Sequence, residues 1–165
     1  MRKPQIAAVL VTAVCVLPVA LRSGTGSSRS IAAQVEGVKL IVTTPSGDKC
    51  FCASQADTET ERQSGLSPDG DPTPFDAMLF TWTAAVTPSF WMKDTDKSLD
   101  VAFVSHDGTV AEVLNMPPCT ATPCPAYRSP VPTKLAVEAP ALERMGIVKG
   151  VRVRVAEPCK VNTDE

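Results

Sequence analysis

Short apolar runs separated by turn residues dominate the hydrophobic pattern of this chain beyond its N-terminal part. Residues 38–42 and 49–53 flank a Pro-Ser-Gly-Asp turn, which predicts a β-hairpin. Residues 99–104 and 109–114 flank an Asp-Gly pair, and Asp-Gly between two apolar runs is a strong hairpin signal. We therefore expect two antiparallel hairpins, one early in the domain and one near its centre.

Two short helices and four further strands complete the pattern. Thr58 and Glu61 form a capping box, and Gly65 stands at a helix C-cap position, so residues 58–64 are expected to form a short helix. A second short helix is expected at residues 140–145. Further strands are expected at residues 77–82, 89–93, 133–139 and 151–155.

These elements predict a mainly β (α+β) fold. We expect a small barrel-like or rolled antiparallel sheet of about seven strands with two short helices, in which one face of each strand is buried. Six prolines between residues 117 and 132 predict a long, stiffened loop. Residues 34–165 are expected to form a single β-rich domain.

The N-terminal part has a different pattern. Arg2 and Lys3 precede residues 6–21, an apolar stretch without charged side chains, and small polar residues follow. This order is typical of a secretory signal, and the stretch is shorter than the roughly 20 residues that a membrane-spanning helix needs. We expect residues 1–33 to be a signal peptide, or a membrane anchor with the start of a tether. The protein is then exported, and it meets a membrane only through this segment if the segment is retained.

Charge is unevenly distributed between the leader and the expected domain. Residues 34–165 hold all 18 Asp and Glu but only 12 of the 16 Lys and Arg, so their formal net charge is −6, against −2 for the whole chain. Nucleic acids and anionic membrane surfaces attract clustered Lys and Arg, so neither is an expected partner. The expected partner is a small or polymeric ligand or an exported protein, and no cofactor is expected.

Five cysteines lie in the expected domain. In an exported protein they form disulfides more often than metal sites. Cys119 and Cys124 are close enough in the chain to bridge each other, and Cys159 would then pair with Cys50 or Cys52, which leaves one thiol over. Cys50, Cys52, Cys119 and Cys124 could in number form a zinc site. Their spacing and the expected export disfavour it, so no metal is expected.

A series of short motifs runs through the expected domain. They are Glu61-Arg62, Gly65-Leu66, Ala77-Met78-Leu79-Phe80, Phe90-Trp91-Met92-Lys93-Asp94-Thr95, Leu99-Asp100-Val101-Ala102-Phe103-Val104 and Pro117-Pro118-Cys119. Over residues 38–156 their order resembles the domain-of-unknown-function 192 family. The resemblance implies a compact, mostly β domain that is often exported, and it brings no established activity. Asp94 departs from the family pattern, which has Asn here, and it adds a charge beside Lys93.

The densest group of polar and aromatic side chains lies around residues 89–100. The candidate ligand-binding residues are Trp91, Lys93, Asp94, Thr95, Asp100 and Tyr127. In a regular strand Trp91 and Lys93 share a face, and an aromatic ring beside a cation and carboxylates suits sugars, peptides or small anions. In the alternative interpretation, Trp91 is packed and Lys93 pairs with a neighbouring aspartate at the rim of the sheet.

Two functions and one structural role remain open. The leading hypothesis is a non-catalytic binding module outside the cytoplasm, with a cleft between residues 90–100 and the Pro-rich loop. The alternative is a hydrolase or lyase that uses Asp94 and Asp100, with Lys93 stabilising negative charge and Glu138 as a further carboxylate. In the structural role, the same block of residues serves only to build the sheet. The sequence does not name the ligand or substrate.

Overall fold

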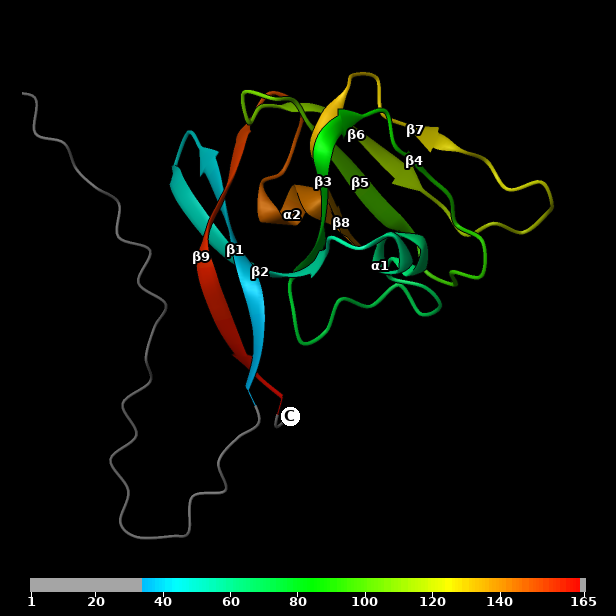
Figure 1. Cartoon of the computed structure of the whole chain (residues 1–165), viewed down its shortest axis with the longest axis horizontal. Helices are drawn as coiled ribbons and strands as arrows, with labels where there is room; N and C mark the ends of the chain where they lie inside the picture. Colours follow the sequence, from blue (N-terminus) through cyan, green and yellow to red (C-terminus); the bar gives the residue numbers. More distant parts are fainter. Residues whose placement is uncertain (1–33, 164–165) are drawn as a thin grey trace, which may run out of the picture.

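The computed structural model describes residues 34–163, so the expected signal segment lies outside the described residues. Seven strands form one sheet, two strands form a second, small sheet, and two short helices complete the fold (Figure 1). The elements are β1 (Gln34–Thr44), β2 (Gly47–Ala56), α1 (Glu59–Ser64), β3 (Ala77–Val86), β4 (Ser89–Phe90), β5 (Leu99–Val104), β6 (Val110–Met116), β7 (Tyr127–Arg128), β8 (Thr133–Ala139), α2 (Leu142–Met145) and β9 (Arg152–Asn162). None of the helices in residues 34–163 is long and apolar enough to span a bilayer.

The hairpins and the first helix form where the local sequence signals predict them. The β1–β2 hairpin turns at Gly47, with φ 117°, and the β5–β6 hairpin turns at Gly108, with φ 85°, a conformation that glycine adopts without steric cost. Thr58 and Glu61 form the capping box that begins α1, and Gly65 ends the helix. Both hairpins and the first helix are therefore confirmed.

The strand order in the large sheet is β6-β5-β8-β3-β2-β1-β9. All neighbouring strands are antiparallel except β2 and β3. The expectation of a wholly antiparallel sheet is wrong at this pair, because the segment between β2 and β3 carries α1 and crosses over, as parallel neighbours require. Within the described residues, the outer strands β6 and β9 meet at one bridge, between Thr109 and Arg152, and the sheet is not closed into a barrel. The mainly β fold is confirmed, and the barrel form is not.

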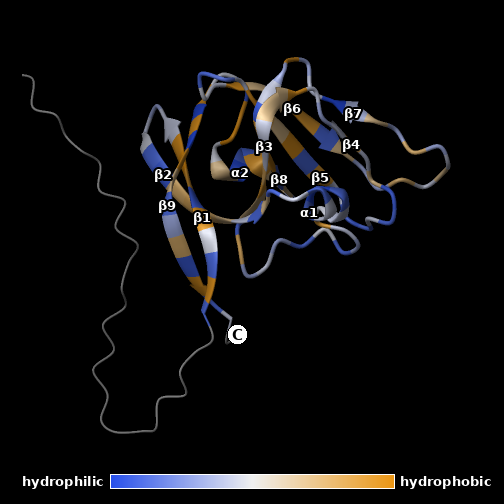
Figure 2. Ribbon diagram, in the orientation of Figure 1, coloured by the Kyte–Doolittle hydropathy of each residue, from blue (hydrophilic) through white to orange (hydrophobic). Residues whose placement is uncertain are grey.

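Two hydrophobic clusters hold the fold together. Successive residues of β5 enter different clusters, because side chains alternate between the faces of a strand. Phe103 lies in a cluster with Phe80, whereas Val104 lies in a cluster that α2 enters through Leu142. The strands accordingly carry alternating bands of apolar and polar residues (Figure 2). This alternation predicts that a residue two positions from a core residue faces the same cluster.

Two disulfides within residues 34–163 join distant and local parts of the chain. Cys52 on β2 and Cys159 on β9 are bonded, with Cα atoms 5.9 Å apart, although β1 separates the two strands in the sheet. Cys119 and Cys124 close a turn within the Pro-rich loop. Both pairs agree with the expected pairings, with Cys52 rather than Cys50 as the partner of Cys159. No cysteine among residues 34–163 is free, so the expected leftover thiol is not found.

Candidate functional site

A cavity of about 260 Å³ lies between α1 and the loop that follows β4. One wall is formed by residues 62–67, at the end of α1 and in the turn after it. The opposite side is formed by residues 90–95 except Met92, and Phe80, Leu99 and Glu138 contribute from the sheet. Pockets that hold drug-sized ligands measure about 300–1,000 Å³, so this cavity suits a smaller ligand or the end of a larger one.

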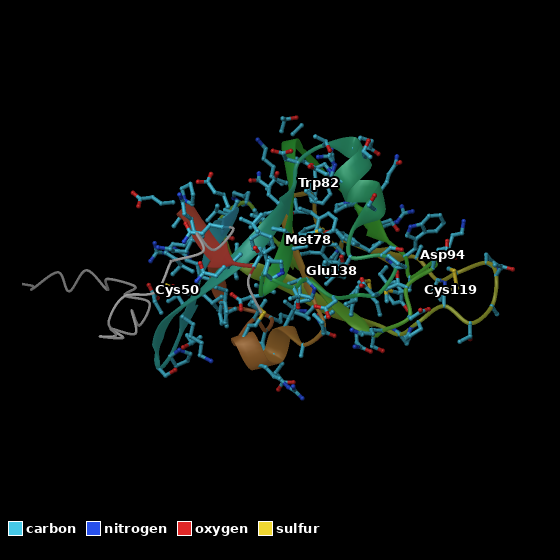
Figure 3. The ribbon with its side chains drawn as sticks, turned by 90° about the horizontal axis from the view of Figure 1, so that it is seen from below. Cys50, Met78, Trp82, Asp94, Cys119 and Glu138 are labelled. Carbon is cyan, nitrogen blue, oxygen red and sulfur yellow. A yellow bond between two sulfur atoms is a disulfide. The ribbon has the colours of Figure 1, made fainter. Side chains whose placement is uncertain are left out.

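Glu138 brings a carboxyl group into this wall from the interior of the sheet. On β8 it lies two positions after Ala136, so both residues face the cluster that contains Phe80. Glu138 is only 4% exposed, and its Oε2 has no hydrogen-bond partner among the described residues. Burial raises the pKa of Glu138 to about 7, and the backbone N–H of Leu66 opposes this rise only in part. Figure 3 shows the side chain in the interior of the fold, beside Met78 of the neighbouring strand.

Arg62 contributes a second charged group, from the last turn of α1. Its Nη1 donates to the backbone carbonyls of Thr81, at 2.9 Å, and of Asp57, and its Nη2 lies 3.3 Å from the carboxylate of Glu59. The guanidinium also lies 5.8 Å from the ring centroid of Trp82. Despite these contacts, Nε of Arg62 is buried without a hydrogen-bond partner. The cavity wall therefore includes two residues that each keep one buried polar atom unpaired.

The loop after β4 forms the more exposed side of the cavity. The strand expected at residues 89–93 ends at Phe90, because the chain leaves the small sheet there and turns at Asp94, whose φ is 55°. Trp91 is 59% exposed, so the interpretation that it is packed is wrong. Nζ of Lys93 lies 5.8 Å from the Trp91 ring centroid and 3.9 Å from the Asp94 carboxylate. A turn, rather than a shared strand face, brings these three side chains together.

The positive φ of Asp94 is compatible with its departure from the family pattern. It is the one non-glycine residue among residues 34–163 with a positive φ. Asn and Asp enter this region more readily than other residues, because their short polar side chains form local hydrogen bonds. Exchange of Asn for Asp is therefore compatible with the turn, and it changes only the charge. The hydroxyl of Ser67 donates to the backbone carbonyl of Asp94 at 2.9 Å and ties the two walls together, while the adjacent Thr95 is buried in the cavity lining.

Two of the predicted ligand-binding residues lie outside the cavity lining. Asp100 accepts hydrogen bonds from Nδ2 of Asn115 at 2.8 Å and from the backbone N–H of Leu142 at 3.1 Å, at the start of α2. Tyr127 lies on β7 and packs against the Phe80 cluster. The cavity therefore gathers four of the six candidates, and the expected pairing of two aspartates as acid and base does not occur there.

The expected cleft between residues 90–100 and the Pro-rich loop is also wrong. The small sheet of β4 and β7 occupies that side, and the part of the Pro-rich loop between β6 and β7 projects from the body of the fold (Figure 1). The second wall is α1 and its turn, so Arg62 is a site residue that the sequence does not predict, and Glu138 is predicted only as a further carboxylate. A usable signal was present, because Glu138 interrupts the apolar run at residues 135–139 and a lone buried glutamate is rare.

The chemistry available in the cavity is that of hydrogen bonding and ring contact. A carboxyl group with a pKa near the ambient pH can donate or accept a hydrogen bond, and a guanidinium N–H donates. Within residues 34–163, no three His, Cys, Asp or Glu side chains are grouped so that they could hold a metal ion. The arrangement is thus suited to holding a small ligand through a few polar contacts and one aromatic face.

Comparison with known proteins identifies the family of the chain. Residues 41–155 match the family DUF192, described as "Uncharacterized ACR". A solved structure of a candidate transcription regulator from Sinorhizobium meliloti is similar, with a TM-score of 0.60 and 25% identity over 75% of this chain and 95% of that one. A protein of unknown function from Novosphingobium aromaticivorans is similar with the same TM-score of 0.60 and 25% identity, over 80% of this chain and 99% of that one. No curated protein matches the chain. The chain therefore belongs to the DUF192 family, whose function is unknown.

Proposed function

We propose that this protein is an exported, non-catalytic module that binds a small ligand in the cavity between α1 and the loop after β4. The observation that carries the proposal is the buried carboxyl of Glu138, which lines the cavity and keeps Oε2 unpaired. A buried polar group without a partner costs about 1–3 kcal/mol. A bound ligand that pairs with Oε2 would recover much of this free energy, whereas a purely structural role would be served better by an apolar side chain.

The exposed side of the cavity supports the same proposal. Trp91 presents a large aromatic surface to solvent at the cavity, and Lys93 lies beside it. Exposed aromatic rings next to charged groups are more typical of binding surfaces than of sheet edges. The positive φ of Asp94 adds to this, because backbone conformations of this kind cluster at ligand sites.

Two kinds of observation support export. The N-terminal sequence has the charged, apolar and small-residue order of a secretory signal. The two disulfides within residues 34–163 are of a kind that persists in oxidising compartments and is rare in the cytosol. The ligand is accordingly one that the protein meets outside the cytoplasm.

The test is a search for ligands by NMR on the protein as its host cell produces it, with the disulfides intact. A library of neutral, cationic and anionic small compounds is added, and the backbone amide signals are followed. At least one compound should move the signals of Leu66, Trp91 and Thr95 and raise the melting temperature. If compounds of all three classes leave the cavity signals in place, the binding proposal is wrong.

Two lysines allow a matched control for the contribution of charge at the cavity. Lys93 and Lys97 are equally exposed and each pairs with an aspartate, but only Lys93 lines the cavity. Lys93→Ala should weaken the binding of the compound found in the screen, and Lys97→Ala should leave it unchanged. Equal effects of the two substitutions would place the binding site elsewhere.

A second candidate function is hydrolysis, and the raised pKa of Glu138, about 7, favours it, because a general acid near neutral pH needs such a value. The second carboxylate would be Asp94, which lines the same cavity, in place of Asp100. This candidate predicts that glycosides or esters yield products and that Glu138→Gln stops the reaction. The binding module instead returns its ligand unchanged, which product analysis by mass spectrometry would establish.

A further inference from the structure

The charged side chains of the cavity wall are largely neutralised within the protein. Arg62 lies 3.3 Å from the carboxylate of Glu59, and Lys93 lies 3.9 Å from that of Asp94. An anionic ligand would lie near Asp94, and a cationic ligand would lie near Arg62 and Lys93. In both cases the ligand would lose hydration, and no unpaired opposite charge at the rim would offset this cost. Glu138 supplies only part of such a charge near neutral pH, because burial raises its pKa to about 7. The wall therefore favours a ligand without net charge.

The unpaired polar atoms specify which neutral group fits. Oε2 of Glu138 can donate or accept according to its protonation, and Nε–H of Arg62 can only donate. A hydroxyl group both donates and accepts, so it can satisfy either atom in either protonation state of the carboxyl. Gly65 lies beside this oxygen, since a Cβ at this position would lie 3.4 Å from Oε2.

The apolar surface of the cavity specifies the shape of the rest of the ligand. Trp91 is 59% exposed, and Phe90 and Leu99 line the cavity beside it. A flat aromatic face packs against a ring of C–H groups, and the volume of about 260 Å³ allows one such ring rather than a long chain. A ligand with hydroxyl groups on its edge and C–H groups on its faces combines both requirements.

We infer that the cavity binds a single neutral sugar ring, with a hydroxyl hydrogen-bonded to Glu138 and a C–H face against Trp91. The inference rests on the proposed binding function and names the ligand class for the same site. The ring is either a free monosaccharide or the end of a longer glycan, whose remaining units lie outside the cavity. Neutral, cationic and anionic sugars of similar ring shape distinguish a site for neutral sugars from a site for charged ligands.

The experiment is an NMR titration of the protein, with its disulfides intact, with three neutral hexoses (glucose, galactose and mannose), with glucosamine and with glucuronic acid. At least one neutral hexose should move the amide signals of Leu66 and Trp91. The amine and the acid should bind at least about tenfold more weakly, because each brings an uncompensated charge. Tighter binding of the amine or the acid, or no binding of any hexose, would overturn the sugar class.

Different results would refute the binding function and the sugar class. If the hexoses do not bind but another compound of the library moves the cavity signals, the ligand class is wrong and the binding function stands. If no compound of any class moves these signals, both proposals are wrong. A longer glycan that ends in the best hexose should move the same signals, because its remaining units lie outside the cavity.

Substitutions then assign the contacts. Trp91→Ala should lower the affinity for the best hexose about tenfold, and this exposed position leaves the fold intact. Glu138→Gln keeps hydrogen-bonding groups and should change the affinity by less than about threefold, whereas Glu138→Met should lower it at least about tenfold. Val148→Ala, at an exposed apolar residue outside the cavity, is the control. An unchanged affinity in Trp91→Ala or in folded Glu138→Met would refute the assigned contact.

Discussion

Replacement of Glu138 by Gln should remove a pH dependence of stability that lies between about pH 4.5 and pH 7. The pKa of this carboxyl is raised from 4.5 to about 7 in the folded protein, chiefly by burial. Within this interval the unfolded chain releases the proton and the folded chain keeps it, so stability falls as the pH rises. Below the interval both states are protonated and above it both are ionised, so the contribution of Glu138 is constant there.

The size of the effect follows from the difference between the two pKa values. One pKa unit corresponds to about 1.4 kcal/mol, so the rise of Glu138 from 4.5 to about 7 amounts to about 3 kcal/mol. For a domain of this size, this corresponds to a shift of roughly 10 °C in melting temperature. The pKa values of four other carboxyls are shifted, all downward, so their contributions to stability are lost only in acid below the interval. They are Glu61, Asp71, Asp107 and Glu112.

The assay is urea unfolding at pH 5, 6, 7 and 8, followed by tryptophan fluorescence with the disulfides intact. The wild-type protein should lose about 2.5 kcal/mol relative to the Gln variant across this range, and the variant should be the more stable form at pH 8. Glu112→Gln is the control, because this half-buried carboxylate lies 2.8 Å from Lys149 and its pKa is lowered. A constant difference between wild type and Glu138→Gln from pH 5 to pH 8 would refute the reasoning.

Three further variants test contacts that stabilise the fold, each by its free energy of unfolding in urea. Ser at both Cys52 and Cys159 opens a loop with a sequence separation of 107 and should cost about 4–5 kcal/mol; no loss of stability would contradict this. Thr58→Ala removes the cap of α1 and should cost about 1 kcal/mol; no loss would mean that the cap is dispensable. Gly37→Ala places a Cβ 2.5 Å from Cε1 of Phe75 and should cost about 1–3 kcal/mol, of which Phe75→Leu should recover part. Full stability of Gly37→Ala alone would contradict that close approach.

Much of the fold is predictable because its signals are local. The strand expected at residues 133–139 is β8 (Thr133–Ala139) with the same bounds. The Asp-Gly turn and the capping box of Thr58 each involve residues within one turn of each other, so their geometry depends little on the rest of the chain. The candidate block around Trp91 was visible for the same reason, as a dense polar and aromatic run.

The errors concern contacts between distant segments. The parallel pairing of β2 with β3 depends on a crossover that contains α1, and nothing in either strand distinguishes it from an antiparallel pairing. The strand at residues 89–93 ends early because β4 pairs with the distant β7 for only two residues. Arg62 and Glu138 meet at one cavity only after both segments have packed against the sheet.

The family, the mainly β class, the hairpins, the capped helix and most of the exposed side of the candidate site can be predicted from the sequence alone. Each of these depends on the order of neighbouring residues, whose preferences act over one turn or one strand. Only the tertiary structure decided that Asp100 caps α2 while Glu138 lines the cavity. Burial decides this outcome, because the low-dielectric surroundings that raise the pKa of Glu138 are built from strands far apart in the chain. The proposed ligand chemistry therefore follows from packing and not from any motif.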